Sequence, residues 1–367
     1  MRNSFFIILT IVLLIAVMGI SSIYSSTYQK EGDFWEVIYK RQVLWLLLGL
    51  FLFLLISNLN YRRLWDWTYL LYLAAIIFLL LVFILGIVRS GAQRWLRVVW
   101  FNFQPSELTK LIMVVFLSKY FSRKSVSDTS LLSGKFGIFR GLIWPFLFVA
   151  IPMFLIIQQP DLGSGVMILF LFLAMLYLTN VKIKYIVIFF LLMALFFPIA
   201  WGALRDYQKE RLLVFLNPNI DPLGAGYTVI QSKIAIGSGG FFGKGWLAGT
   251  QSQLHFLPES HTDFIFATFV ELWGFLGGMV LLLLYYLLIR QGFIIAQRTS
   301  DHFGRLLAYG ISLMLGIQLF INVAMTLGLA PVVGLPLPLM SYGGSSVVVT
   351  LISLGILVSV DRRRAVF

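Results

Sequence analysis

Cysteine is absent from this chain of 367 residues, so neither a disulfide nor a thiolate metal site can form. Charge is scarce as well, because 12% of the residues are charged and 60% are hydrophobic. The apolar run that follows Asn3 lacks a small-x-small cleavage site and reaches Ile20, which indicates an uncleaved first span rather than a signal peptide. This composition excludes a soluble globule and indicates a polytopic membrane protein.

Apolar runs of roughly 17 to 25 residues recur along the whole chain, and each is long enough to cross a bilayer as a helix. They predict an all-α integral membrane protein with about ten transmembrane helices, folded as a single polytopic domain over residues 1–367. The expected spans are 4–24, 42–58, 67–87, 107–122, 142–158, 164–180, 183–201, 264–289, 304–328 and 346–360.

The charges between these spans predict the orientation in the membrane. An even number of spans places both termini on one side, and most of the 28 lysines and arginines fall on that side. By the positive-inside rule this face is cytoplasmic. The net charge of +13 then reflects topology and contact with anionic membrane lipids, not nucleic acid.

The opposite face receives the loops 25–41, 88–106, 202–263 and 329–345. The loop 202–263, between the seventh and eighth spans, is far longer than a usual connection and is therefore expected to be a functional element. Its end, residues 249–266, gathers two of the three histidines, two carboxylates and several amides and hydroxyls. The chemistry of the protein is therefore expected outside the cytoplasm.

Asp263 begins the eighth apolar run and has two interpretations. Ser260 and Asp263 fit a capping box, in which Ser260 caps the helix and Asp263 closes its first turn. Alternatively, Asp263 is an ionised carboxylate that accepts a proton in catalysis. A metal site at His255 and His261 is not expected, because their spacing matches no zinc pattern and Pro258 breaks any helix between them.

Glu107 and Lys110 lie three residues apart on the fourth span, near enough to pair on one helix face. Ionisable groups in the hydrocarbon region are costly and usually mark a cavity or a pathway. The alternative is an ordinary first helical turn, with Ser106 as the cap and Glu107 at the positive end of the helix dipole.

The outer loop 88–106 sets three arginines, Arg89, Arg94 and Arg97, beside Trp95. Arginine forks suit phosphate oxygens, whereas an interfacial segment anchored by tryptophans would explain the same residues without a ligand. Lys233 and Lys244, in the long loop, are further candidate anion contacts. The glycines of residues 237–245 do not have P-loop spacing, and they are expected to let the backbone pack closely or re-enter the membrane.

Several motifs in order along the chain resemble the SEDS family of bacterial wall synthesis, which acts in shape, elongation, division and sporulation. They are Gln104-Pro-Ser-Glu107, Gln159-Pro-Asp-Leu-Gly-Ser164, Gly249-Thr-Gln251, Leu257-Pro-Glu-Ser-His-Thr-Asp-Phe-Ile-Phe266 and Pro336-Leu-Pro-Leu-Met-Ser-Tyr-Gly-Gly344. The resemblance covers nearly the whole chain. The segment 211–218 and the residues that follow Gly249 resemble the members that act in cell elongation more than those that act in division.

The resemblance implies a peptidoglycan glycosyltransferase of the bacterial inner membrane that polymerises lipid II into β-1,4 glycan and releases undecaprenyl pyrophosphate. Asp263 matches the family's essential aspartate and would be the general base. The pyrophosphate leaving group needs cations rather than a second acid, and Arg94, Lys110 and Lys233 are the candidates. Magnesium or manganese at the pyrophosphate is the candidate cofactor. Further substrate-binding candidates are Gln104, Glu107 and His261.

The implied partners are a class B penicillin-binding protein with transpeptidase activity and the other proteins of the elongation complex. Two rival functions stay open at this point. A lipid II flippase would suit the spans and the intramembrane charge pair, although no inverted pair of broken helices is evident in the sequence. A non-catalytic scaffold would leave polymer yield unaffected by any change in the outer loop.

Overall fold

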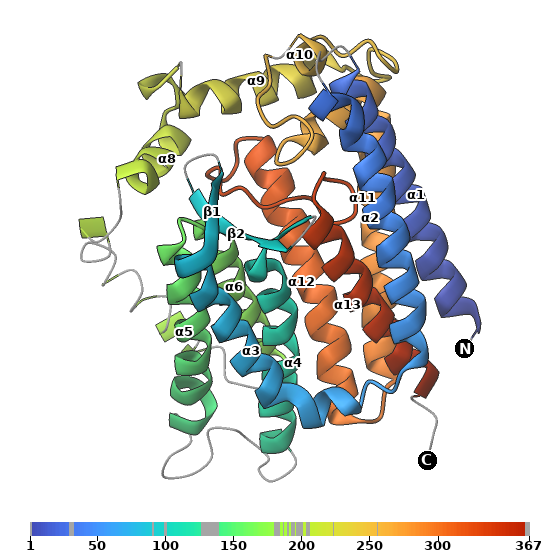
Figure 1. Ribbon diagram of the computed structural model, residues 1–367, viewed down its shortest axis with the longest axis vertical. Coiled ribbons are helices and arrows are strands. Elements are labelled where there is room, and N and C mark those ends of the chain that lie inside the picture. Colours follow the sequence, from blue (N-terminus) through green and yellow to red (C-terminus); the bar gives the residue numbers. More distant parts are fainter. Residues whose placement is uncertain are drawn as a thin grey trace. The chain divides into compact units, whose positions relative to one another are not determined.

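The computed structural model describes residues 2–28, 33–89, 92–98, 101–125, 139–179, 206–222, 224–254 and 256–363, with residues 184–185, 187–188, 191, 195 and 201–202 in short pieces (Figure 1). The chain divides into two compact units. The first comprises residues 1–55, 207–291 and 318–355, and the second comprises residues 56–206, 292–317 and 356–367.

Within the described residues, seven helices are long and apolar enough to span a membrane: Ser4–Thr27 within α1 (Arg2–Thr27), Val37–Asn58 within α2 (Asp33–Asn58), α3 (Arg63–Leu85), Gly141–Gln158 including α5 (Trp144–Gln158), α11 (Ile265–Arg298), α12 (His302–Thr326) and α13 (Gly344–Arg363). The expected all-α, multi-pass membrane fold is thereby confirmed.

The expected spans 107–122 and 164–180 are also helices, but they are not among these seven. The apolar helix α6 (Leu162–Tyr177) is shorter, and α4 (Pro105–Ser125) is a helix interrupted by charged residues. The expected span 183–201 lies largely outside the described residues, so the count of ten stays a prediction.

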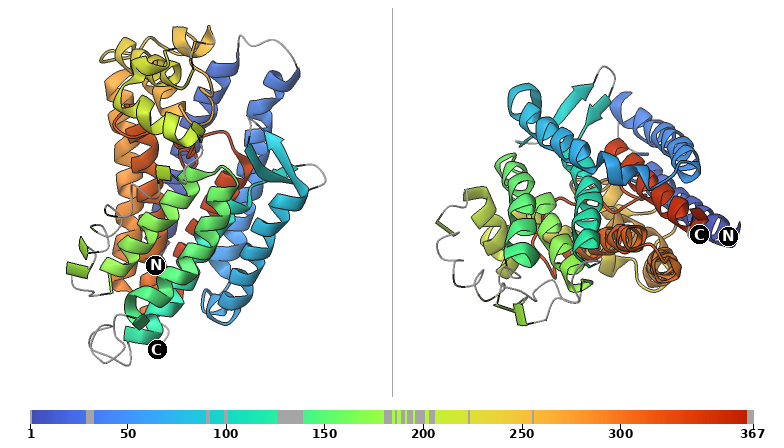
Figure 2. Two further views of the ribbon diagram at one scale, coloured as in Figure 1. Left: turned by 90° about the vertical axis from the view of Figure 1, so that its left-hand side faces the viewer. Right: turned by 90° about the horizontal axis from the view of Figure 1, so that it is seen from below.

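In the second unit, α3, α4, α5 and α6 pack side by side, and a small sheet lies against α3 and α4 (Figure 2). The sheet is antiparallel, in the order β1 (Gly86–Arg89), β2 (Ala92–Val98), β3 (Phe101–Phe103). Helix α4 is buried along nearly its whole length, which explains how it carries charged residues among apolar helices. The helix-based prediction had described residues 88–106 only as a loop.

The long loop 202–263 folds into short helices: α8 (Asp206–Leu216), the 3-10 turn η2 (Pro218–Ile220), α9 (Ala225–Ser238) and α10 (Thr250–Gln253). Its turn formers act as their chemistry predicts. The Asn217 side chain accepts a hydrogen bond from the backbone N–H of Asn219, at 3.1 Å, and Asp221 accepts one from Gly224, at 2.9 Å. In the first unit α9 packs against α10, and α10 packs against α1.

Helix α11 is broken at Gly274, where φ is 68°. The glycine-rich segment 240–245 satisfies the backbone groups around this break. Lys244 and Gly245 donate to the carbonyls of Glu271 and Leu272, each at 3.0 Å, while Phe275 and Leu276 donate to those of Gly240 and Phe241, at 2.9 and 3.1 Å. Irregular backbone in a membrane-spanning helix needs such partners from protein, and the expectation that these glycines allow close backbone packing is confirmed.

Gly243 tests this packing. A Cβ at this position would lie 2.2 Å from the carbonyl oxygen of Leu272, on a residue whose φ is +85°. Gly243→Ala is therefore expected to destabilise the protein by about 1–3 kcal/mol, which thermal unfolding in detergent will show as a lower midpoint. Gly237→Ala is the control, because a Cβ there meets nothing within 4 Å. Equal midpoints for the two variants would contradict the proposed close approach.

Candidate functional site

Asp263 lies in a tight turn just before α11, which begins at Ile265. The backbone N–H groups on either side of it, of Thr262 and Phe264, both donate to the carbonyl of Glu259, at 3.1 and 3.2 Å. Glu259 adopts a φ of 50°, which a non-glycine residue rarely takes. The Asp263 side chain is half-buried, and its backbone is strongly constrained.

The capping-box interpretation of this turn is wrong. The hydroxyl of Ser260 is buried and has no hydrogen-bond partner among the residues that the structure describes. The Ser260 carbonyl instead accepts a hydrogen bond from the Thr268 hydroxyl, at 3.0 Å. Because α11 begins five residues after Ser260, Asp263 does not close a first helical turn capped by Ser260.

Three consecutive carbonyls at this turn are each bound by the C-terminal part of the first unit. The His261 carbonyl accepts from the backbone N–H of Tyr342, at 2.9 Å. The Thr262 carbonyl accepts from the Ser341 hydroxyl, at 2.7 Å, and the Asp263 carbonyl accepts from the Asn322 amide, at 3.0 Å. The backbone of Asp263 is therefore fixed at the peptides on both sides of its side chain.

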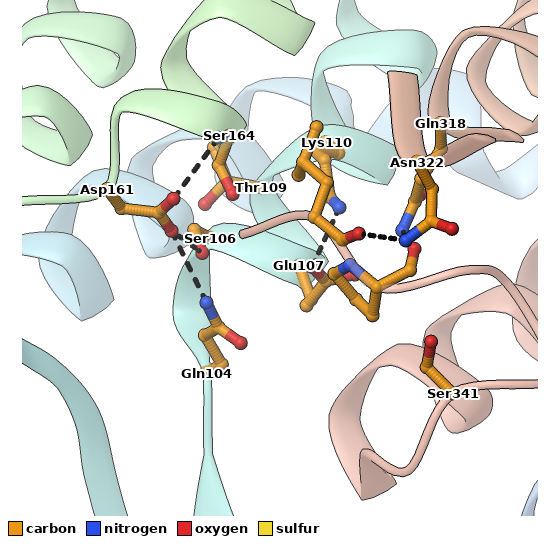
Figure 3. A network of polar contacts seen from close by, with 12 residues as sticks. Gln104, Ser106, Glu107, Thr109, Lys110, Asp161, Ser164, Gln318, Asn322 and Ser341 are labelled. Carbon is orange, nitrogen blue, oxygen red and sulfur yellow. Dashed lines mark hydrogen bonds and ion pairs between the residues drawn. The ribbon is translucent and has the colours of Figure 1, made fainter. Parts of the chain in front are cut away.

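The donors of these bonds are themselves held in place. The Asn322 amide also donates to the Leu335 carbonyl, at 2.7 Å, and Gln318, one turn earlier on α12, donates to the Pro336 carbonyl, at 2.9 Å (Figure 3). Gln42 on α2 donates to the Ser341 carbonyl, at 3.0 Å, and accepts from Gly343, at 3.2 Å. Residues 335–343 thus form a buttress around the turn that carries Asp263.

The other candidates in the first unit differ in exposure. His261 is 6% exposed, and its ring lies 5.9 Å from that of Tyr342, measured between centroids. Lys233 on α9 is exposed, and its stem passes close to Gly328. His255 lies outside the described residues. His261 therefore belongs to the Asp263 turn, whereas Lys233 offers an accessible ammonium in the outer loop.

In the second unit Glu107 and Lys110 form the predicted ion pair, with 2.7 Å between the Lys110 Nζ and the Glu107 Oε1. The two side chains are 4% and 1% exposed, respectively. Burial of two charges is costly, and their attraction offsets that cost only when the geometry is good. Ser106 is not the predicted cap, because it lies within α4, which begins at Pro105, and its hydroxyl donates to Asp161 at 3.0 Å.

Asp161 is a functional candidate that the sequence analysis did not single out. It is 2% exposed and lies at the start of α6, where it accepts from the backbone N–H of Ser164, at 3.2 Å. It also accepts from Ser106, and from the Gln104 amide at 3.3 Å (Figure 3). The signal was present in the sequence, because Gln104 and Asp161 belong to two of the motifs that carry the family resemblance.

Arg94, on β2, joins this same region of the second unit. Its guanidinium donates to the carbonyl of Pro160, the residue before Asp161. Its Nε is buried and has no partner among the residues described. The structure thus brings Arg94 and Gln104 together at the turn of residues 160–161. Arg97 lies on the same strand as Arg94, and it is exposed.

Comparison with known proteins places these residues in a wider context. The chain matches the family model described as "Cell cycle protein", FtsW/RodA/SpoVE, over residues 2–366. It is 40% identical over 357 residues to the peptidoglycan glycosyltransferase MrdB of Escherichia coli K12, covering 97% of this chain and 93% of that protein.

Solved structures agree with this match. The chain resembles a chain described under the structural coordination of polymerization and crosslinking by a peptidoglycan synthase complex, with a TM-score of 0.81 and 33% identity over 98% of both chains. It also resembles the rod shape determining protein RodA of Thermus thermophilus, with a TM-score of 0.71 and 29% identity over 98% of this chain and 96% of that one.

The buried pair of Glu107 and Lys110 makes a double-variant test possible. Lys110→Met leaves an uncompensated buried carboxylate and is expected to cost about 3–5 kcal/mol of stability, while adding Glu107→Leu should recover most of the loss. Thermal unfolding of the purified variants measures both effects, with Lys40→Met, at an exposed lysine on α2, as the control. A double variant no more stable than Lys110→Met alone would show that the pair is not coupled.

Proposed function

The chain belongs to the FtsW/RodA/SpoVE family of cell cycle proteins, and from that premise we propose that it is a peptidoglycan glycosyltransferase that polymerises lipid II during cell elongation. The names of its relatives support this activity over a lipid II flippase. We assign Asp263 as the base. The observation that supports this assignment is its position, since the carboxylate is half-buried and lies on a turn whose backbone is fixed at three successive carbonyls.

The proposed reaction is one displacement at a sugar. A hydroxyl oxygen of the acceptor attacks the anomeric carbon of the donor, and Asp263 takes the proton of that hydroxyl as the new bond forms. The bond from the anomeric carbon to the pyrophosphate oxygen breaks, and undecaprenyl pyrophosphate leaves with the electron pair. Attack opposite an α-linked lipid gives a β-linked glycan, so the enzyme inverts configuration.

The leaving group is already a weak base, so cations rather than an acid are needed to stabilise its charge. Lys233 in the first unit, and Arg94 and Lys110 in the second, are the proposed anion contacts of the lipid-linked substrates. Arg94 is the most suited of the three by chemistry, because guanidinium forks match phosphate oxygens and its Nε is buried without a partner in the described residues. The charge of Lys110 is already matched by Glu107.

A divalent cation is proposed to accompany the pyrophosphate. Among the described ranges no three His, Cys, Asp or Glu side chains lie together as a metal site. The proposed ion is of the magnesium type, which keeps several waters and binds mainly through substrate phosphates with one or two carboxylates. Such an ion would supply positive charge at the leaving group through the phosphate oxygens of the substrate.

We further propose that the protein lies in the bacterial inner membrane, with both termini cytoplasmic and the Asp263 turn outside. A class B penicillin-binding protein is the proposed partner, since one similar structure is described as part of a peptidoglycan synthase complex. The eighth and ninth predicted spans, now α11 and α12, are the proposed contact.

Asp263→Asn tests the proposed base. An amide of the same size cannot take up the hydroxyl proton, so polymerisation of lipid II by the purified protein with its partner should fall by about 10²–10⁴-fold. Glu210→Gln, at an exposed carboxylate on α8 of the same outer loop, should keep wild-type activity. Glycan made at the normal rate by Asp263→Asn would rule out the assignment, and lipid II translocation by that variant in liposomes would favour the flippase.

The divalent ion has its own test. A chelator should slow glycan synthesis, and added magnesium or manganese should restore it. Calorimetry on the purified protein without lipid II should show no tight binding of either ion. Full activity after exhaustive chelation, or tight binding of an ion by lipid-free protein, would contradict an ion that arrives with the pyrophosphate.

A further inference from the structure

Glu271 is a fully buried carboxylate, 0% exposed, in the apolar helix α11. The proposed chemistry gives it no task. An ionisable group is expensive within a membrane-spanning segment and is retained there only with partners. The hydrogen-bond donors to its carboxylate show which segment Glu271 holds in place.

Among the described residues, the donors to Glu271 all come from one short stretch of the outer loop, residues 244–252. Its Oε1 accepts from the Lys244 ammonium, at 2.9 Å, from the Gln251 backbone N–H, at 2.8 Å, and from the Thr250 hydroxyl, at 3.2 Å. Its Oε2 accepts from both the backbone N–H and the hydroxyl of Ser252, at 3.3 and 3.2 Å. The carboxylate thus receives five hydrogen bonds and fastens the start of α10 to α11.

Hydrogen bonds continue from this anchor to the turn that carries Asp263. The carbonyl of Gln251 accepts from the backbone N–H of Leu257, at 3.0 Å, and two residues later Glu259 accepts from both neighbours of Asp263. Leu257 also shares a buried apolar cluster with Phe264, the residue after Asp263. A displacement of α10 would therefore move the turn.

We propose that Glu271 is a positioning residue for proton transfer at Asp263, acting through the segment 249–259. This inference rests on the proposed function, because Asp263 must be the base for its position to govern the rate. A misplacement of about 1 Å can cost about a hundredfold in rate, so the anchor acts on turnover rather than on substrate affinity.

The chemistry of the anchor calls for a carboxylate rather than an amide. Every partner of Glu271 is a donor, and both carboxylate oxygens accept. In Glu271→Gln one oxygen becomes an NH₂ group, which can only donate. Its two N–H groups then face an N–H or an ammonium that also donates, so no hydrogen bond forms between them. Glutamine has almost the same size as glutamate, yet the variant loses the hydrogen bonds that one of the two carboxylate oxygens accepts. Thr250→Val with Ser252→Ala is the companion variant, which removes two hydroxyl donors and keeps the charge.

Polymerisation kinetics with the intact chain and its partner test the proposal. Glu271→Gln should lower kcat by about tenfold or more, and the companion variant should lower it less. KM for lipid II should stay within about threefold, because binding is not the affected step. Glu210→Gln is again the matched carboxylate control. Wild-type kcat in Glu271→Gln, or an effect confined to KM, would overturn the proposal.

Hydrogen exchange separates positioning from folding, and separates this inference from the proposed function. Exchange in Glu271→Gln should accelerate over residues 249–264 and stay at the wild-type rate in the other membrane helices. Faster hydrogen exchange along the whole chain would show that Glu271 is needed only for stability, and it would overturn the proposal. If Asp263→Asn polymerises normally, the assignment of Asp263 as the base fails, while localised exchange in Glu271→Gln would still establish the anchor.

Discussion

Three consecutive peptide carbonyls, of His261, Thr262 and Asp263, are held by donors from the end of the chain, and the candidate site depends on this contact. A misplacement of about 1 Å can cost a catalytic group about a hundredfold in rate. Once the peptides on both sides of Asp263 are fixed, only its two side-chain torsions remain to be set. The proline-rich segment before α13 therefore has a direct role, since it supplies the Ser341 and Tyr342 donors.

The same turn shows how a local rule gives way to tertiary contacts. Ser260 and Asp263 have the spacing of a capping box, which would direct the carboxylate to backbone N–H groups of its own helix. The carbonyls of residues 260–263 instead accept hydrogen bonds from Thr268, Tyr342, Ser341 and Asn322, in that order. Because the helix starts later, at Ile265, Asp263 is released from a capping role. Tertiary contacts to its backbone, rather than a capping rule, therefore place this residue.

Much of the fold could be predicted from sequence, because span length and apolar composition are strong signals for membrane helices. The Glu107–Lys110 pair was predictable for a similar reason, since residues three apart on a helix are neighbours. The three-stranded sheet at residues 86–103 was missed, because its short strands carry little periodicity among the apolar runs. Asn322 was missed because its partner lies far along the chain, and no local pattern reports such a contact. Asp161 lies in one of the family motifs, but its contact with Ser106, 55 residues away, could not be predicted from that motif.

Glu271 and the break at Gly274 follow from one constraint. Inside a membrane every polar group needs a protein partner, so a helix that is interrupted must bind another segment at the break. The segment 240–245 meets the freed backbone groups of α11, and the next residues, up to Ser252, meet the carboxylate that lies three residues before the break. The loop is thus attached to α11 by backbone and side chain together. Such an attachment limits how far the loop can shift, because a shift would leave the Glu271 carboxylate and the freed backbone groups of α11 without their partners.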